Sequence, residues 1–254
     1  MFLLVSMLIL NTVTDALQVI GGSVTVVQGG TAVLPCKVVD TTETVVKISW
    51  QRLTRGNELR RENFFTTESP LVHGHDDRFK LIGSLNDRNG SLLLPNVTLN
   101  DEGTYTCIFT LFPSGNHKRD IRLQLLVPPV TSLKDYHPTL GSEEVALVSC
   151  TASGSKPPAG VRWLTDTLVE KVRTTTNSTF HANGTTTTVS SLFGVPTREI
   201  SHHSVQCVIT GVALLEEKAL PFTIEVASRA HSHLADTTVC FFVCLFVCLF
   251  LFVH

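Results

Sequence analysis

Cysteine and tryptophan recur along this chain in the same order and at nearly the same spacing. The order cysteine, tryptophan, cysteine occurs twice, at Cys36, Trp50 and Cys107 and again at Cys150, Trp163 and Cys207. In both copies the tryptophan follows the first cysteine after thirteen or fourteen residues. None of these cysteines forms a C-x-x-C pair, so the spacing does not indicate a zinc site. The repeat predicts two domains built on one plan.

This order and spacing is typical of an immunoglobulin β-sandwich. There, one disulfide joins strands B and F across the two sheets, and a tryptophan from strand C packs against it. The first interval, 36–107, leaves room for the extra C′ and C″ strands of a variable-type domain, whereas 150–207 fits a constant-type domain. The sequence therefore predicts an all-β chain of two tandem immunoglobulin-like sandwiches, variable-type over 17–127 and constant-type over 129–227, each with its own disulfide.

Apolar residues alternate around both cysteine pairs, as they do in strands with one buried face. In the first domain the predicted strands B, C, E with F, and G lie within 31–39, 46–53, 90–107 and 119–127. In the second domain strands B, C, E, F and G are predicted within 143–152, 160–166, 185–195, 202–211 and 218–226. The Val127-Pro128-Pro129-Val130 segment between them is predicted to be a short, stiff linker, because two prolines keep the chain extended.

A tyrosine corner and an ion pair are predicted at the base of the first sandwich. Tyr105 lies two residues before Cys107, where a tyrosine hydroxyl ties back to the preceding turn. Asp101 lies six residues before Cys107, and Arg78 is its expected partner across the base of the domain. In the second domain Val205 occupies the corresponding position, so no tyrosine corner is expected there.

Both ends of the chain are apolar and are not expected to belong to the two folded domains. Residues 1–16 have the apolar core and the small-residue site of a signal peptide, which places the mature chain in an oxidising, extracellular setting. Residues 228–238 are polar and predict a stalk. Residues 239–253 are fifteen consecutive apolar positions, for which a short single-pass span and a glycolipid-attachment signal both remain open. A plasma-membrane protein with an extracellular ectodomain is expected.

Four N-x-S/T tripeptides predict N-linked glycosylation at Asn89, Asn96, Asn177 and Asn183. All four fall in polar, turn-like stretches. A glycan at any of them would mark a face that is not an interface.

No catalytic or metal-binding pattern was found. G-x-S-x-G, P-loop and H-E-x-x-H motifs are absent, and the histidine clusters His73-x-His75 and His202-His203 have no converging partners. The net charge of -2 offers no electrostatic footprint for nucleic acid. An enzyme is therefore not expected, nor is a cofactor.

The stretch "TLFPSGN", residues 110–116, follows the predicted strand F and is expected to form the F–G hairpin loop. Gly115-Asn116 suits a turn, but Leu111, Phe112 and Pro113 are not what turning requires. Two interpretations remain open from the residues alone: Phe112 folds back beneath the loop, or it is a rigid aromatic anchor for a partner.

Strand F also predicts a partly apolar interaction surface. Ile108 alternates with Cys107 and should point outward from the G-F-C-C′ sheet, beside an outward Gln51 and Thr106. This surface favours the interpretation of Phe112 as an anchor. The residues expected to contact a partner are Phe112, Pro113, Leu111, Ile108 and Gln51.

The segment "DEGTYTCIFTLFPSGN" resembles strand F and the F–G loop of nectins and poliovirus receptor-like proteins. "GSKPPAGVRW" and "NGTTTTVSSLFGVPTREISHHSVQC" are similar to their second domain, so the resemblance covers about residues 22–226. It implies cell-surface display and recognition of related immunoglobulin receptors. In that family the loop aromatic enters a lock on the partner, which implies that Phe112 with Pro113 is the key.

Two departures from the family pattern bear on the choice of partner. The family lock motif, just ahead of strand C, falls on Val45-Val46-Lys47, and the second lock segment falls near residues 64–71; neither keeps the expected residues. The resemblance therefore favours a heterophilic partner over self-binding. The function expected is that of an adhesion or immune-recognition receptor or ligand; the alternative is a secreted or shed decoy competing for the same receptors.

Overall fold

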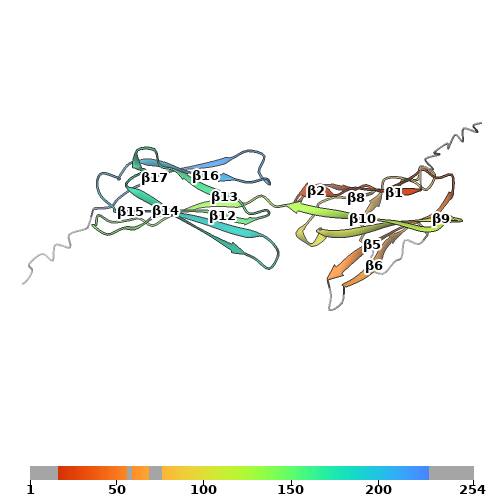
Figure 1. Ribbon diagram of the computed structural model, residues 1–254. Coiled ribbons are helices and arrows are strands. Elements are labelled where there is room, and N and C mark those ends of the chain that lie inside the picture. The colour runs from red at the N-terminus through yellow and green to blue at the C-terminus, as the bar shows by residue number, and fades with distance from the viewer. Residues whose placement is uncertain (1–16, 56–58, 69–75, 229–254) are drawn as a thin grey trace, which may run out of the picture.

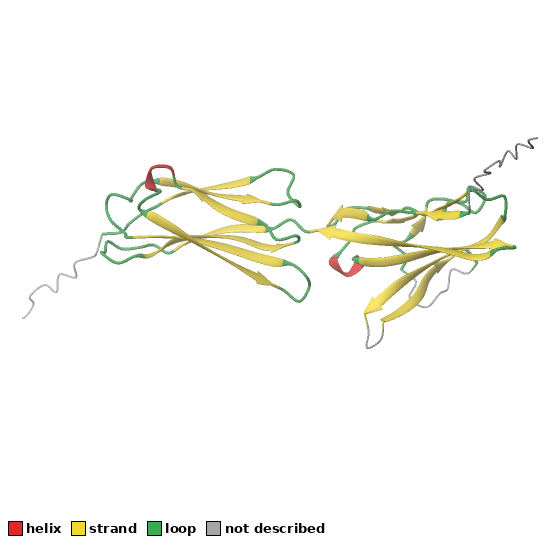
Figure 2. Cartoon of the chain, in the orientation of Figure 1, coloured by secondary structure: helices red, strands yellow, loops and turns green. Residues whose placement is uncertain are grey.

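The computed structural model describes residues 17–55, 59–68 and 76–228, which form two β-sandwiches placed end to end (Figure 1). Helix is limited in this part of the chain to two short 3-10 turns, η1 (Leu99–Asp101) and η2 (Asp166–Leu168), as Figure 2 shows. The predicted signal peptide, most of the predicted stalk and the apolar segment 239–253 lie outside the described residues. Within the described part, no helix has the length and hydrophobicity to cross a membrane.

Ten strands lie in the described part of the first sandwich. They are β1 (Gln18–Ile20), β2 (Val24–Val27), β3 (Ala32–Leu34), β4 (Lys37–Val39), β5 (Thr44–Arg55), β6 (Leu59–Thr66), β7 (Lys80–Leu81), β8 (Leu92–Leu94), β9 (Gly103–Phe112) and β10 (Gly115–Leu126). One sheet has the order β2-β10-β9-β5-β6 and faces a second sheet of order β3-β8-β7, with β1 paired to β4. In immunoglobulin terms β5, β6, β9 and β10 are strands C, C′, F and G.

The C′ strand β6 gives this sandwich its variable-type layout. No C″ strand occurs among the described residues between β6 and β7, and 69–75 are not described. The first strand of the five-stranded sheet, β2, runs parallel to β10, with Leu123 opposite Val24.

The core of the first domain is organised around its disulfide and tryptophan. Cys36 and Cys107 are bonded with their Cα atoms 6.5 Å apart, and both are buried. The indole Nε1 of Trp50 donates to the carbonyl of Gly90 over 2.9 Å. Residue 90 must be glycine, because an added Cβ would lie 2.7 Å from Cγ2 of buried Ile48. The tryptophan thus joins β5 to the turn before β8 without leaving its polar atom unpaired.

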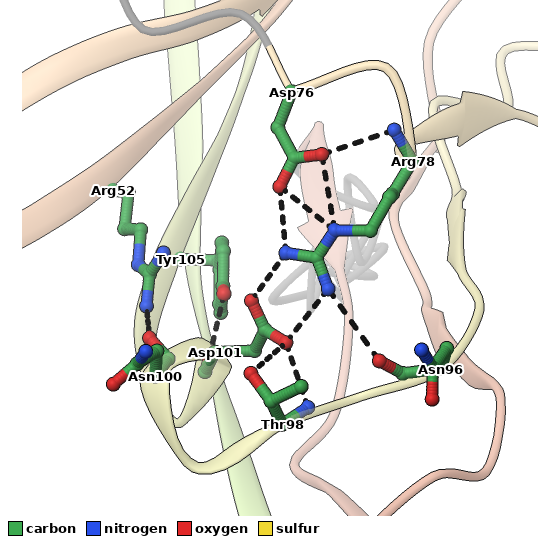
Figure 3. A network of polar contacts seen from close by, with 8 residues as sticks. All are labelled: Arg52, Asp76, Arg78, Asn96, Thr98, Asn100, Asp101 and Tyr105. Atoms are coloured by element: carbon green, nitrogen blue, oxygen red, sulfur yellow. Dashed lines mark hydrogen bonds and ion pairs between the residues drawn. The ribbon is translucent and has the colours of Figure 1, made fainter.

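The base of the first domain is held by an ion-pair network around the buried Asp101 (Figure 3). The guanidinium of Arg78 binds both oxygens of Asp101 at 2.9 and 2.7 Å and also binds Asp76. Asp101, whose side chain is 2% exposed, accepts further hydrogen bonds from the backbone N–H and hydroxyl of Thr98. The Tyr105 hydroxyl donates to the Asp101 carbonyl over 2.6 Å, as expected for a tyrosine corner. Asp76 and Thr98 are members of this network that the sequence did not predict.

Burial and the neighbouring charges shift the pKa of Asp101 in opposite directions. Burial would raise the pKa of Asp101, but the hydrogen bonds from Arg78 and Thr98 outweigh it and hold that pKa below its ordinary value. The pKa of Asp76 is lowered chiefly by its hydrogen bond with Arg78. The same two carboxylates, Asp101 first, raise the pKa of Arg78. Burial raises the pKa of Tyr105 to about 12.

The second sandwich has seven strands. They are β11 (Val130–Asp135), β12 (Val145–Ser155), β13 (Gly160–Leu164), β14 (Val172–Phe180), β15 (Thr186–Gly194), β16 (Ser204–Thr210) and β17 (Lys218–Thr223). The sheet β11-β12-β15-β14 faces the sheet β13-β16-β17, which is the A-B-E-D and C-F-G arrangement of a constant-type domain. The disulfide Cys150–Cys207 joins β12 to β16, strands B and F.

The core of the second domain is smaller and partly polar. Its buried apolar residues fall into two clusters, and the inner side of β15 contributes the buried hydroxyls of Thr186, Thr188 and Ser190. Trp163 is half-buried, and its indole Nε1 is buried without a hydrogen-bond partner. The second domain therefore lacks the tryptophan-to-backbone bond that ties the first domain together.

The two domains meet through a short backbone bridge and an ion pair. Val127 and Lys156 exchange two backbone hydrogen bonds of 2.8 and 3.0 Å. The Lys156 ammonium, from the second domain, also pairs with the half-buried Glu102 carboxylate of the first. Glu102 in turn accepts a hydrogen bond from the backbone N–H of Leu125. The backbone bonds and the ion pair together therefore restrict the rotation of one sandwich relative to the other.

Lys156→Glu is expected to loosen this junction while both sandwiches stay folded. The change places two carboxylates side by side, and the half-buried pair that it removes is worth about 1 kcal/mol. Small-angle scattering of residues 17–228 should show a wider range of interdomain distances. Lys171→Glu is the matched control, because its partner Glu199 lies within the second domain. Scattering that is unchanged would mean that the backbone bridge alone sets the angle.

Candidate partner-binding face of the first domain

The G-F-C-C′ face is the outward face of β10, β9, β5 and β6. Along β9 the inward positions Cys107, Phe109 and Leu111 are buried, so Ile108 and Thr110 lie on the outer side. Ile108 is half-buried, opposite Ser49 of β5 and Lys118 of β10.

This face is more polar than the sequence predicted. Thr106 is 2% exposed, and its hydroxyl donates to Asp120 over 2.6 Å. Gln51 lies opposite Thr106 and is half-buried. Thr110 donates to Asn116. On the outward side of β9, Ile108 lies between Thr106 and Thr110, and Phe112 ends the strand on the same side.

The F–G connection is shorter than the predicted loop over 110–116. β9 continues to Phe112 because it is paired on both sides, with Thr44 of β5 opposite Phe112 and Gly115 of β10 opposite Leu111. Only Pro113 and Ser114 remain as the turn. Gly115 has φ +88°, which glycine adopts without strain.

Phe112 is exposed and Leu111 is not. The Phe112 side chain is 71% exposed, so of the two interpretations the structure excludes the one in which it folds beneath the loop. Leu111 is 3% exposed and belongs to the core, so its assignment as a partner contact is wrong. Pro113 is exposed beside Phe112, and Val46, on the neighbouring strand β5, is 49% exposed. The tip of the sheet therefore presents apolar side chains to solvent.

The turn that carries Phe112 is braced from a distant loop. The Ser114 backbone N–H and hydroxyl both donate to Oε2 of Glu43, over 3.1 and 2.6 Å. The Ser114 hydroxyl also lies 2.9 Å from Nε2 of His117. Since a hydroxyl has one proton, the arrangement is satisfied when His117 donates to Ser114. This brace was not predicted, because Glu43 and Ser114 are 71 residues apart and form no sequence motif.

Glu43→Ala is expected to loosen the turn without unfolding the domain. It removes the acceptor of both Ser114 hydrogen bonds, which at an exposed site are worth about 1 kcal/mol in total. We expect the Ser114 amide to exchange hydrogen about fivefold faster, measured by exchange mass spectrometry or NMR. Asp87→Ala is the control, because Asp87 makes a similar exposed contact with Ser84. Exchange at Ser114 that is the same in both variants would contradict the brace.

The first of the two segments that correspond to the family lock lies beside this turn. Val45-Val46-Lys47 is within β5 rather than ahead of it, and a register shift separates Val45 from Lys47. Lys47 pairs with Glu68 at 3.2 Å. The second segment begins at Phe64, which is buried, and extends into residues outside the described part. The key and the first lock segment are thus neighbours on paired strands.

The glycosylation tripeptides avoid the five-stranded sheet. Asn89 and Asn96 flank β8 of the opposite sheet; Asn177 lies on β14 and Asn183 in the β14–β15 turn. Asn89 is half-buried, whereas the other three are exposed. Glycans at all four positions would leave the G-F-C-C′ face uncovered.

Within residues 17–55, 59–68 and 76–228, no group of three or more His, Cys, Asp or Glu side chains is placed to hold a metal ion. His73 and His75 lie outside these ranges.

The comparisons with known proteins identify the family. The immunoglobulin V-set domain family matches residues 21–127, and the CD80-like C2-set immunoglobulin domain family matches residues 128–218. Mouse nectin-2 is 28% identical over 204 residues, which is 78% of this chain and 38% of nectin-2. Nectin-4 of Xenopus tropicalis is 29% identical over 208 residues, 80% of this chain and 38% of its own length. The chain consists of a V-set domain followed by a C2-set domain and is similar to proteins of the nectin-like immunoglobulin family.

Members of this family are adhesion molecules rather than enzymes. The nectin-like chain spans about 38% of the length of these two relatives. The ectodomain structure of mouse nectin-like molecule 4 has the same fold, with a TM-score of 0.64 and 22% identity over 82% of this chain and 67% of that one.

Proposed function

We propose that this nectin-like chain is a cell-surface recognition protein that binds a nectin-type immunoglobulin receptor through its G-F-C-C′ face and F–G turn. The observation that carries the proposal is Phe112, a 71% exposed phenylalanine on a braced two-residue turn. An exposed phenylalanine of this kind costs solvation free energy in the free protein and regains it in a partner's pocket.

The brace from Glu43 favours binding because it reduces the conformational freedom that association must remove. Ordering a mobile aromatic side chain or loop at an interface costs about 0.5–1.5 kcal/mol for each immobilised side chain. A turn already fixed to Glu43 and His117 avoids part of that cost. The polar surface around Ile108, which carries no glycosylation tripeptide, then supplies the hydrogen-bonding rim that surrounds an apolar anchor in protein interfaces.

The proposed partner is a different member of the family rather than a second copy of this chain. In a symmetric dimer the same chain must present both key and lock. Here Phe112 retains the key, whereas Lys47 replaces the polar uncharged end of the lock motif and is held by Glu68. Burying this partly exposed Lys47–Glu68 pair at the core of an interface would remove both charges from water, which is costly. This argument supports heterophilic recognition.

Sedimentation of residues 17–228 at rising concentration, alone and mixed with nectin-family ectodomains, tests the proposal. We expect a monomer that forms a complex with at least one relative. Concentration-dependent dimers that are lost on Phe112→Ala would instead establish homophilic adhesion. Absence of any complex across the family would contradict the proposed function.

We also propose attachment to the plasma membrane through residues 239–253. The support is the fifteen-residue apolar run, which suits a short span or a glycolipid-attachment signal. Fractionation of expressing cells before and after phosphatidylinositol-specific phospholipase treatment separates the two. Recovery of the chain only in the medium would favour the soluble decoy.

A further inference from the structure

The outermost strand of the second domain, β14, is an unusually long and regular sheet edge. It has nine residues, Val172–Phe180, and is the longest edge strand among those described. It pairs with β15 without a break, from Val172 opposite Gly194 to Phe180 opposite Thr186. No bulge interrupts it, so its other edge offers a continuous row of backbone N–H and C=O groups.

The composition of β14 makes this edge a template for a further strand. Residues 174–180 carry no charge and no proline or glycine, and they consist mainly of threonine, which favours strands. The other edges of this domain each have a protective feature. β17 contains Pro221, β13 has only five residues and includes Arg162, and β11 ends in Lys134-Asp135.

A glycosylation tripeptide lies at the middle of this edge. Asn177 is the sixth of the nine residues and is exposed, as are Ser178 and Thr179. A second tripeptide, at Asn183, follows in the turn that ends the same strand. We propose that Asn177 carries an N-linked glycan whose role is to block strand addition at the free edge of β14. The glycan would replace the lysine, proline or bulge that protects other edges.

The modification is a glycosyl transfer with no change of oxidation state. The side-chain nitrogen of Asn177 forms a bond to the anomeric carbon of an oligosaccharide carried on a lipid diphosphate. The bond from that carbon to the diphosphate oxygen breaks, the lipid diphosphate leaves with the electron pair, and the amide loses one proton. The donor and the transferase belong to the secretory pathway, through which the proposed function also requires the chain to pass.

The proposal is otherwise independent of the recognition face. Self-association through Phe112 is excluded from the test by introducing Phe112→Ala into every variant. Self-association measured in these variants then reports on pairing through β14 and not on partner binding at Phe112. The glycan proposal and the proposed function can therefore fail independently.

Three substitutions within the tripeptide separate the glycan from the strand itself. Ser178→Ala changes β14 but keeps the tripeptide, Thr179→Ala removes the glycan and leaves an uncharged edge, and Thr179→Lys removes the glycan but adds a charge. Ser178 and Thr179 are both exposed, so the fold is not expected to change. Equal melting temperatures check this, and Asn177→Gln provides a second unglycosylated form.

The full chain is produced in glycosylating eukaryotic cells, and occupancy of Asn177 is read by mass spectrometry of glycosidase-treated peptides. Chemical crosslinking at rising concentration then measures self-association. We expect Thr179→Ala and Asn177→Gln to self-associate at least tenfold more strongly than the parent chain, and Ser178→Ala and Thr179→Lys to remain monomeric. An unmodified Asn177 in the parent chain, or monomers in all variants, would overturn the proposal. So would a glycosylated parent chain that dimerises through β14.

Discussion

Phe112→Ala is expected to weaken binding to the nectin-family partner at least tenfold while the first domain keeps its stability. Tenfold corresponds to about 1.4 kcal/mol, and truncating a central aromatic anchor often costs about 2 kcal/mol or more. Phe112 is 71% exposed in the free protein, so its removal takes little from the core. Binding measured by surface plasmon resonance, together with the melting temperature, checks both parts of the expectation.

Phe180→Ala is the matched control for this experiment. Phe180 is 76% exposed at the end of β14 in the second domain, so the variant removes an equally exposed phenylalanine from another surface. The control should bind as the parent chain does. If Phe112→Ala and Phe180→Ala bind with the same affinity as the parent, the first-domain tip is not the anchor.

Arg78→Ala is expected to lower the free energy of unfolding of the first domain by about 2–3 kcal/mol. The change leaves the carboxylate of Asp101, whose side chain is 2% exposed, without its bidentate partner. Breaking a buried pair in this way costs about 3–5 kcal/mol, and the smaller figure applies because the Arg78 side chain is 36% exposed. Urea unfolding followed by Trp50 fluorescence measures the difference.

Arg162→Ala is the control, since its partner Glu217 is 61% exposed and the pair lies on the surface of the second domain. We expect a change of less than about 1 kcal/mol. Arg78→Lys should fall between the two, because lysine keeps the charge but not the two-pronged contact. A loss that is equal for Arg78→Ala and Arg162→Ala would mean that the network of Figure 3 does not hold the base of the domain.

The stability cost of Arg78→Ala is expected to shrink as the pH falls. In the parent chain the pKa of Asp101 is lowered from its ordinary value of 3.8, so its stabilisation is complete above that value and is lost as the pH falls through the lowered one. In the variant the buried carboxylate has lost its partner, so its pKa rises. Protonation at lower pH then removes the unpaired buried charge and with it the cost to folding. Unfolding measured at pH 7, 5 and 3 should show the two proteins converging. A constant difference would contradict the assignment to Asp101.

The parts of the fold that follow local rules were predictable. The repeated cysteine and tryptophan spacing, the alternation from Ala32 to Val38 and the position of Tyr105 each depend on a single strand or corner, and the structure shows all three features. The two tandem domains with V-set and C2-set character were predicted from the same pattern. The paired position of Arg78 and Asp101 follows from the same arrangement of strands.

The unpredicted features depend on contacts between distant residues or on strands without a buried face. β14 is exposed along nearly its whole length, so it has no hydrophobic alternation to reveal it. The F–G turn was expected to be longer because pairing of Phe112 with Thr44 could not be inferred from either segment alone. The burial of Leu111 follows from that extension, since continuing the alternation of β9 turns residue 111 inward. The brace of Ser114 by Glu43 has no local signal at all.

The course of β10 has a mechanical consequence. This strand runs without interruption from the turn beside Phe112 to the linker at Val127. It pairs with antiparallel β9 over Gly115–Leu123 and with parallel β2 over Leu123–Leu126. Tension between a bound partner and the cell would be directed along the strand, so its hydrogen bonds would be loaded together in shear rather than opened one by one. The Cys36–Cys107 bond ties β9 to the opposite sheet at the same time. Under the proposed function, a pull on a partner bound at Phe112 would therefore pass to the second domain through hydrogen bonds that share the load.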